Sequence, residues 1–375
     1  MEEWKEYKLG EVCTKIGSGA TPKGGKEAYL GGNTSLIRSQ NVLDFSFSWD
    51  GLAYINEEQA TKLNGVEIEN GDVLLNITGD SVARACIVPK SALPARVNQH
   101  VSIVRGDASI VLNDYIMYFL QFKKPYLLSL SQGGATRNAL TKGMIEDLPI
   151  PLPPLSKQSE IAHVLKSLDD KIELNRRIND NLEQQAMAIF DKMFPAVALG
   201  ENTIGSMITP KRGKGLLSKD AVEGNVPVVA GGLEPATYHN ESNTVAPVVT
   251  ISASGANAGY VNLWHIPVWS SDSSFIDSSM TQNVYFWYVM LKKRQKEIFD
   301  AQTGSAQPHI YPKHVAEMPL GIFEQSDVAK FTEIVTPMFK IRGKNLKESE
   351  RLASVRDSLL PKLMSGELKL DIINV

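Results

Sequence analysis

The chain has 375 residues, of which 43% are hydrophobic and 22% are charged, and its formal net charge is −3. Two or three domains of about 100–200 residues fit this length. The composition excludes a disordered chain, a collagen-like repeat and a disulfide-stapled miniprotein. The small negative charge excludes binding to nucleic acid by bulk positive charge, but it is compatible with a DNA reader whose basic residues lie on one face.

Cysteine usage and hydropathy bear on the compartment. Cys13 and Cys86 are far apart in the sequence and form no Cys-x-x-Cys pair. No apolar run reaches the roughly 18–20 residues that a membrane span needs. The acidic, amphipathic segment Met1–Glu6 does not resemble a signal peptide. We therefore expect a reduced, cytoplasmic protein that does not associate with membranes.

The sequence contains an internal duplication. Short matches open the two copies: Leu9-Gly10-Glu11 with Leu199-Gly200-Glu201, Thr21-Pro22-Lys23 with Thr209-Pro210-Lys211, and Leu75-Asn76-Ile77-Thr78 with Val249-Thr250-Ile251-Ser252. A constant spacing of 170 positions then relates Asn113 to Asn283, Tyr115 to Tyr285, Tyr118 to Tyr288, Gln132 to Gln302, Gly134 to Gly304 and Pro149 to Pro319. Because one register is kept over this length, the sequence predicts two copies of one structural unit.

Each copy has the same predicted elements in the same order. Strands are expected at Val73–Ile77 and Val248–Ile251, and an aromatic helix is expected at Asp114–Leu130 and again at Asn283–Phe299. A glycine-containing loop and a proline-bearing segment follow. Because proline fixes φ, the proline-rich segment 148–155 should be extended. Ser156 then caps a helix.

A long helix ends each copy. Apolar residues recur at spacings of three and four from Ser156 to Met193, with no proline or glycine between them. The predicted coiled-coil seam consists of Ile161, Leu165, Leu168, Ile172, Asn175, Asn179 and Leu182 in the first helix, and of Val335, Met338, Asn345, Leu352 and Leu359 in the second. Pro337 predicts a late start or a kink in the second helix. An antiparallel pair of spacer helices explains the length better than two helices that each pack on their own domain.

No catalytic signature stands out. Gly25-Lys26 and Gly213-Lys214 lack the remaining residues of a phosphate-binding P-loop. There is no Gly-x-Gly-x-x-Gly motif, no Asn/Asp-Pro-Pro-Tyr/Phe motif of amino-methyltransferases, and no paired histidine spacing for a metal. A binding or scaffolding protein is the expectation, and no metal is expected.

Taken together, these features resemble one known family. A Thr-Pro-Lys loop, the strand end Ile77-Thr78-Gly79, the loop Gly133–Arg137, the proline-rich segment and a long Asn-bearing helix, in two copies, are similar to the specificity (S) subunits of type I restriction–modification enzymes. The resemblance covers essentially the whole chain. It implies an α+β fold in which two similar mixed α/β target recognition domains are separated by two long helices that form an antiparallel coiled coil. The expected boundaries are residues 1–154 for the first domain, 155–195 for the central helix, 196–323 for the second domain and 324–375 for the C-terminal helix.

The resemblance also implies a function. Each domain would read one half of a split site in double-stranded DNA, and the helices would set the gap between the halves and dock two methyltransferase (M) subunits. Restriction (R) subunits would join that core. S-adenosylmethionine, ATP and Mg²⁺ would belong to these partner subunits, while this chain would bind no cofactor and catalyse no reaction.

DNA contacts are expected from basic and amide side chains, because these bind phosphates and base edges. In the first copy the candidates are Lys23, Lys26, Arg38, Gln40, Asn41, Arg84, Arg137 and Asn138. In the second copy they are Lys211, Arg212, Lys214, Asn257, Tyr260, Gln307, His309 and Lys313. Two alternatives stay open: a tandem-domain coiled-coil scaffold that assembles a complex without reading DNA, and a nuclease with an unrecognised motif.

Overall fold

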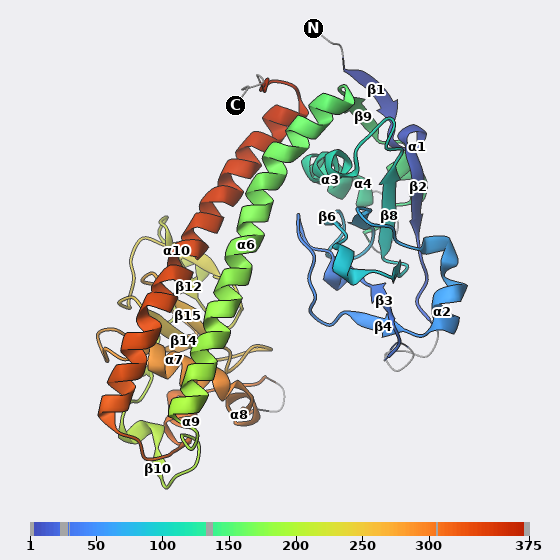
Figure 1. Ribbon diagram of the computed structural model, residues 1–375. Coiled ribbons are helices and arrows are strands. Elements are labelled where there is room, and N and C mark those ends of the chain that lie inside the picture. Colours follow the sequence, from blue (N-terminus) through green and yellow to red (C-terminus); the bar gives the residue numbers. More distant parts are fainter. Residues whose placement is uncertain (1–3, 23–28, 30, 133–137, 305–306, 371–375) are drawn as a thin grey trace. The chain divides into compact units, whose positions relative to one another are not determined.

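The computed structural model describes residues 4–22, 29, 31–132, 138–304 and 307–370. The chain divides into two compact units: the first comprises Met1–Glu173 and Ser349–Val375, and the second comprises Leu174–Glu348 (Figure 1). Each unit therefore holds one copy of the repeat together with part of each of two long helices. Both units are mixtures of helices and small sheets, as the α+β prediction required.

A four-stranded antiparallel sheet forms the centre of the first unit. Its strands, in spatial order, are β2 (Cys13–Ser18), β8 (Val101–Gly106), β5 (Val73–Asn76) and β6 (Ala85–Ile87). All four residues of β5 are buried, which explains its apolar run Val73-Leu74-Leu75. Helix α3 (Asn113–Phe122) packs against this sheet, and its Tyr115 and Phe119 share a core with Val73.

A smaller, three-stranded sheet completes the core of the first unit. It consists of β4 (Ala53–Ile55), β3 (Thr34–Ile37) and β7 (Ala95–Val97), with β3 and β7 parallel. The remaining elements are β1 (Lys5–Lys8), β9 (Pro149–Leu152), α1 (Leu9–Val12), α2 (Glu57–Lys62), α4 (Lys124–Ser131), α5 (Lys142–Glu146) and the 3₁₀ turns Ser39–Asn41, Asn64–Val66 and Lys90–Ala92. The proline-rich segment is extended over β9, as predicted, because β9 pairs with β1 in a two-stranded sheet where a missing N–H is tolerated. The following helix already begins at Leu155, so the predicted cap at Ser156 is wrong.

The second unit repeats this plan. Its four-stranded sheet has the order β11 (Lys211–Arg212), β17 (Ser273–Asp277), β14 (Val248–Ser252) and β15 (Val261–Trp264). The other elements are β13 (Thr237–His239), β12 (Val226–Val229), β16 (Trp269–Ser270), β10 (Asn202–Thr203), β18 (Pro319–Leu320), α7 (Val284–Lys293), α8 (Gln295–Asp300), α9 (Pro312–Ala316) and the 3₁₀ turns Ile204–Ser206 and Ser218–Asp220. The sheet order matches that of the first unit strand for strand.

Each predicted aromatic helix is two helices. The expected helix Asp114–Leu130 is interrupted at Lys123, which caps α3, and its counterpart is interrupted at Arg294, which caps α7. Pro125 lies in the first turn of α4, where its missing N–H costs nothing. Apolar spacing did not reveal the break because the buried face continues across it.

Backbone hydrogen bonds define which residues of the two copies are equivalent. Asn76 N–H donates to the carbonyl of Arg84, and Ser252 N–H donates in the same way to Tyr260. Residues 84 and 260 are 176 positions apart, so the predicted pairing of Leu75 with Val249, at 174, is wrong by two residues. The two strands are so alike in composition that their sequences do not determine which residues correspond. The hydrogen bonds of the turn that follows each strand do determine it.

The two long helices are α6 (Leu155–Met193) and α10 (Gln325–Met364). The predicted late start at Pro337 is wrong, because α10 begins at Gln325 and continues through Pro337. Proline cannot donate to the carbonyl of Glu333, but Glu333 is exposed, so solvent satisfies that group.

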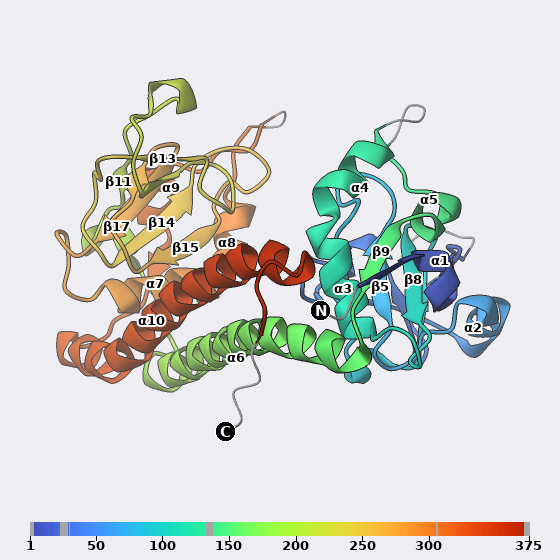
Figure 2. The same ribbon diagram turned by 90° about the horizontal axis from the view of Figure 1, so that it is seen from above.

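Within each unit, parts of α6 and α10 lie side by side (Figures 1 and 2). Every predicted seam residue is buried or half-buried. In the second unit the Asn175 amide donates to Glu348 Oε2 at 2.8 Å, and the Asn345 amide donates to Asn179 Oδ1 at 2.9 Å. These asparagines therefore pair across the helices, an arrangement that fixes register at some cost in stability.

Candidate nucleic-acid interface

Several predicted DNA contacts of the first unit lie along one edge of the four-stranded sheet, namely the edge formed by the ends of its strands. Because neighbouring strands are antiparallel, β2 and β5 end at the edge where β8 and β6 begin. The turn after β5 carries Arg84. Gly79 N–H in the same turn donates to the carbonyl of Asn138 at 3.1 Å, so the segment that holds Asn138 lies at this edge too.

The second unit builds the same edge. Lys211 and Arg212 form β11, and Asn257 and Tyr260 lie in the turn after β14. Gly255 N–H donates to the carbonyl of Pro308 at 3.1 Å, which brings the loop of Gln307 and His309 to that turn. Arg84 and Tyr260 occupy equivalent positions of the two turns. The structure thus brings together most of the candidates of the second copy.

The first unit holds a chain of polar side chains at this edge. His100 Nδ1 lies 2.5 Å from Thr78 Oγ1, and His100 Nε2 lies 3.1 Å from the Gln99 amide nitrogen. Thr21 donates its hydroxyl proton to the amide oxygen of Gln99. Gln99 is exposed, and His100 and Thr78 are half-buried. Sequence reasoning missed Gln99 and His100, although an Asn-Gln-His run between two buried strands was visible in the sequence.

The second unit has a charged cluster at the same edge. Arg212 Nη2 donates to Asp272 Oδ1 at 2.5 Å, and the Ser254 hydroxyl donates to the other carboxylate oxygen. The Arg212 and Asp272 side chains are 41% and 37% exposed. Asp272 was also missed. The predicted contact Arg212 is therefore oriented by a carboxylate instead of extending freely into solvent.

Three of the predicted DNA contacts bond to the backbone of the loop that follows β3. Arg38 Nη2 donates to the carbonyl of Gly51 at 2.5 Å, and the Gln40 amide donates to the carbonyl of Asp50 at 3.1 Å. Asn41 is fully buried, and its side chain bonds to the backbone of this loop on both sides. Since no surface of Asn41 is accessible, its predicted contact with DNA is withdrawn, whereas Arg38 and Gln40 stay candidates.

The remaining candidates divide into two groups. Lys214 lies over the Trp269 ring at 6.0 Å from its centroid, His309 stacks on Tyr311, and Lys313 is exposed in α9. Lys23, Lys26 and Arg137 lie outside the described residues.

A groove lined by lysines runs along β2, an outermost strand of the four-stranded sheet. The cavity is about 570 Å³ in volume and is lined by Lys15, Lys62 and Lys142 together with small residues of β2. Lys62 pairs with Glu58 at 2.6 Å and Lys142 with Glu146 at 3.4 Å, while Lys15 donates to a backbone carbonyl. These lysines were not predicted, because they come from three segments that only the fold brings together.

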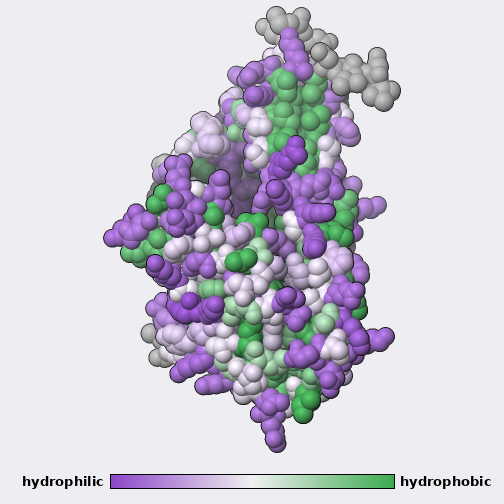
Figure 3. Space-filling model, turned by 90° about the vertical axis from the view of Figure 1, so that its left-hand side faces the viewer, coloured by the Kyte–Doolittle hydropathy of each residue, from purple (hydrophilic) through white to green (hydrophobic). Residues whose placement is uncertain are grey.

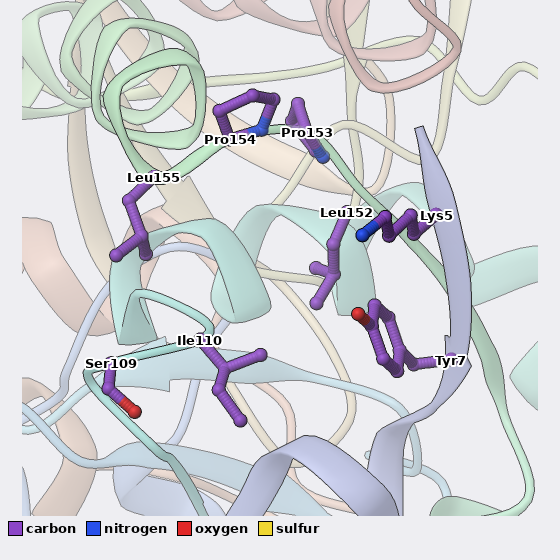
Figure 4. A pocket seen from close by; sticks show the side chains of 8 residues that line it. All are labelled: Lys5, Tyr7, Ser109, Ile110, Leu152, Pro153, Pro154 and Leu155. Carbon is purple, nitrogen blue, oxygen red and sulfur yellow. The ribbon is translucent and has the colours of Figure 1, made fainter. Parts of the chain in front are cut away.

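A second cavity lies where β9 meets α6 (Figure 4). It measures about 360 Å³ and is lined by Lys5, Tyr7, Ser109, Ile110, Leu152, Pro153, Pro154 and Leu155. None of the predicted DNA contacts lines it. Lys5 and Tyr7 are the titratable residues of its lining, and most of the other lining residues are apolar.

Of the two cysteines, Cys86 is buried and Cys13 is partly buried. Burial raises the pKa of the Cys13 thiol to about 12 and raises the pKa of Cys86 further, so both stay protonated at neutral pH. Over the described part of the chain, His, Cys, Asp and Glu nowhere gather in a group of three suited to a metal ion. Over the same residues, no helix has the length and apolarity to cross a membrane.

Comparison with known proteins bears on the family. A family model described as the type I restriction modification DNA specificity domain matches residues 1–184. The chain is 24% identical to the type I restriction enzyme MjaIX specificity subunit of Methanocaldococcus jannaschii, over 99% of this chain and 94% of that protein. Residues 1–184 therefore match the type I specificity domain, and nearly the whole chain is similar to a type I specificity subunit.

Further relatives show the same similarity to specificity subunits. A putative type I specificity subunit of Mycoplasma pneumoniae is 26% identical over 66% of this chain and 72% of its own length. The crystal structure of a type I S subunit from M. genitalium matches with a TM-score of 0.57 at 19% identity, covering 96% of both chains. The resemblance found in the sequence is thereby confirmed, and so is the specificity-subunit fold.

Proposed function

We propose that this chain is the DNA-recognition component of a type I restriction–modification complex, and that each unit reads one half of a two-part site. One observation carries the proposal: the two sheet edges repeat the same backbone hydrogen bonds but present different polar side chains. A repeated framework with different side chains suits two readers of different base sequences, because base edges are distinguished by donor and acceptor patterns.

The two long helices carry the proposed docking surface for two M subunits. Exposed apolar side chains on these helices are Leu174, Ile178, Ile334, Ile341, Leu346 and Val355. Figure 3 also shows hydrophobic residues gathered in a strip at the upper end of this face of the molecule. Exposed apolar surface of this kind is typical of partner-binding sites. R subunits would join through the M subunits.

In this proposal the chain itself catalyses no reaction. S-adenosylmethionine, ATP and Mg²⁺ are bound by the partner subunits, which act on double-stranded DNA in the cytoplasm. A scaffold that does not touch DNA is the less favoured function, since the family comparison concerns a DNA specificity domain.

Mapping methylated adenines tests the proposal. The full chain is expressed with its methyltransferase partner, and the modified sites are compared with those of cells that lack this chain. We expect a two-part motif that depends on the chain. Replacing residues 196–323 by the corresponding domain of another family member should change one half of the motif and leave the other intact. Methylation without any chain-dependent motif would refute DNA reading and favour the scaffold.

A further inference from the structure

We infer that His100 and Asp272 are equivalent positioning residues, each of which orients one base-reading side chain: Gln99 in the first unit and Arg212 in the second. The inference rests on the proposed function and adds to it the reading residues and the class of base that each copy reads.

Backbone geometry makes His100 and Asp272 equivalent. Ile77 N–H donates to the carbonyl of His100 at 2.9 Å, and Ala253 N–H donates to the carbonyl of Asp272 at 3.1 Å. Residues 77 and 253 are 176 positions apart, the same spacing that relates the two turns beside them. Both residues also come immediately before the strand at the same place in the sheet, β8 in one unit and β17 in the other.

The side chains of the two residues are held in the same way. His100 bonds to the hydroxyl of Thr78, and Asp272 accepts from the hydroxyl of Ser254. Thr78 and Ser254 are again 176 positions apart. Each unit therefore has a hydroxyl that fixes a ring or carboxylate, which in turn bonds to one more side chain. The acceptor differs between the copies, and the last side chain comes from a different element in each: Gln99 precedes His100 in the loop before β8, whereas Arg212 lies in β11.

In the first unit the last side chain is an amide. Thr21 donates to Gln99 Oε1, and the Gln99 amide nitrogen donates to His100 Nε2, so the ring proton lies on Nδ1 and is donated to Thr78. These bonds use one N–H and one carbonyl lone pair of the exposed Gln99 and leave the other N–H and the other lone pair available for a base. A donor beside an acceptor complements the N7 and N6 positions of adenine in the major groove.

In the second unit the last side chain is a guanidinium. Arg212 uses one N–H on Asp272 and keeps four of its five donors for other partners. Two parallel N–H donors complement the O6 and N7 acceptors of guanine. Asp272 holds the guanidinium in place and partly neutralises it, so the pair suits a base edge better than a phosphate. The two copies accordingly read different bases: adenine through Gln99 and guanine through Arg212.

The test uses the full chain in complex with its methyltransferase partner. DNA binding is measured against a panel in which every base pair of the two-part site is varied in turn. The variants are Q99A, R212A, D272A and the double variant R212A/D272A, with K330A as a control at an exposed residue of α10. R212Q replaces the guanidinium by the amide of the other copy. Thermal unfolding of each complex shows that the variants are folded.

For R212A we expect about a 10- to 100-fold loss of discrimination at one base pair of one half-site, with the other half-site unchanged. Q99A should lose discrimination at one base pair of the other half. D272A should weaken the same guanine preference as R212A, and the double variant should be no worse than R212A alone, because Asp272 acts through Arg212. R212Q should shift that position from guanine toward adenine.

Three outcomes would overturn the inference. Equal weakening at every base pair in R212A would make Arg212 a phosphate contact. Additive losses in R212A/D272A would give Asp272 a separate structural role. An unchanged motif in both Q99A and R212A would exclude both readers and leave the proposed function standing. If the unaltered complex shows no sequence preference, the proposed function fails and this inference fails with it.

Discussion

Arg356 of α10 and Asp169 of α6 form an ion pair at 2.7 Å inside the first unit, and both side chains are nearly buried. Tyr118 of α3 donates its hydroxyl proton to the second oxygen of Asp169 at 2.6 Å, and the Arg356 guanidinium lies 3.6 Å from the centre of the Phe45 ring. Through these contacts both long helices are attached to the domain of the first unit.

The second unit repeats this arrangement with one difference. Tyr288, the equivalent of Tyr118, donates to Glu183 of α6, and Arg342 of α10 lies 3.7 Å from the same carboxylate. If the repeat were strictly symmetric, the two helices would exchange roles between the units. Instead α6 supplies the carboxylate and α10 the guanidinium in both. Like charges on one helix oppose pairing of α6 with another α6, so this distribution favours pairing of α6 with α10.

Removing Arg356 should destabilise the first unit strongly. R356A leaves the Asp169 carboxylate buried without its cation, and we expect a loss of about 3 kcal/mol in the free energy of unfolding. Adding D169N should recover part of this loss, because the amide still accepts from Tyr118 without a charge. The measurement is denaturant unfolding of the single and double variants. K330A removes an exposed pair with Asp327 and should change stability by less than about 1 kcal/mol; a similar loss in both would contradict the argument.

Acid should destabilise the second unit through His265. Burial, and secondarily the Arg342 guanidinium, lower the pKa of His265 from 6.5 to about 4. The unfolded chain therefore binds a proton in the window from 6.5 down to 4 while the folded chain does not, so stability falls as the pH is lowered through it. Between pH 7 and pH 5 this residue should remove about 2 kcal/mol. H265Q should reduce the pH dependence by that amount in unfolding experiments, and an unchanged slope would refute it.

Two helical glycines should respond to alanine in opposite directions. A Cβ at Gly343 of α10 would lie 2.8 Å from Cγ of the His265 ring, whereas a Cβ at Gly143 of α5 meets nothing within 4 Å. Alanine improves helix propensity by about 1 kcal/mol at either site. At Gly343 the overlap with a rigid ring costs about 1–3 kcal/mol, so the net effect should be destabilising. Thermal unfolding of G143A and G343A compares them directly, and stabilisation by both would show that the ring gives way.

The sequence predicted the duplication, the extended proline segment and the two long helices, because each is encoded by local spacing or by repetition. It did not predict the break at Lys123, since one apolar face spans both α3 and α4. The candidate site was harder to predict. Asn41 is of a residue type that commonly contacts DNA, but it is buried in its own loop. Gln99 and Asp272 become candidates only because the fold brings their bonding partners beside them.

The basic groove along β2 should contribute to binding through phosphates. Replacing Lys15, Lys62 and Lys142 by alanine should weaken DNA binding by the assembled complex equally for all sequences, because phosphate contacts carry no base information. The slope of log affinity against log salt concentration should become shallower by about 1 for each lysine that contacts phosphate. Replacing the exposed residues Lys90, Lys296 and Lys330 gives a charge-matched control. An equal change of slope in both triple variants would mean that the effect is one of net charge alone.

Lengthening both long helices by one heptad should change the gap in the recognised site. The bond between Asn345 and Asn179 fixes which levels of α10 and α6 face each other in the second unit, so matched insertions after Arg177 and Lys347 preserve the pairing on either side. Seven residues add about 10.5 Å of helix, which corresponds to about three base pairs at 3.4 Å each. Mapping methylated adenines should then show unchanged half-sites with a gap longer by about three base pairs. Insertion into α6 alone places its asparagines out of register with Asn345 and should abolish a defined motif. If the doubly lengthened chain methylates the original spacing, the helices do not determine the distance between the two readers.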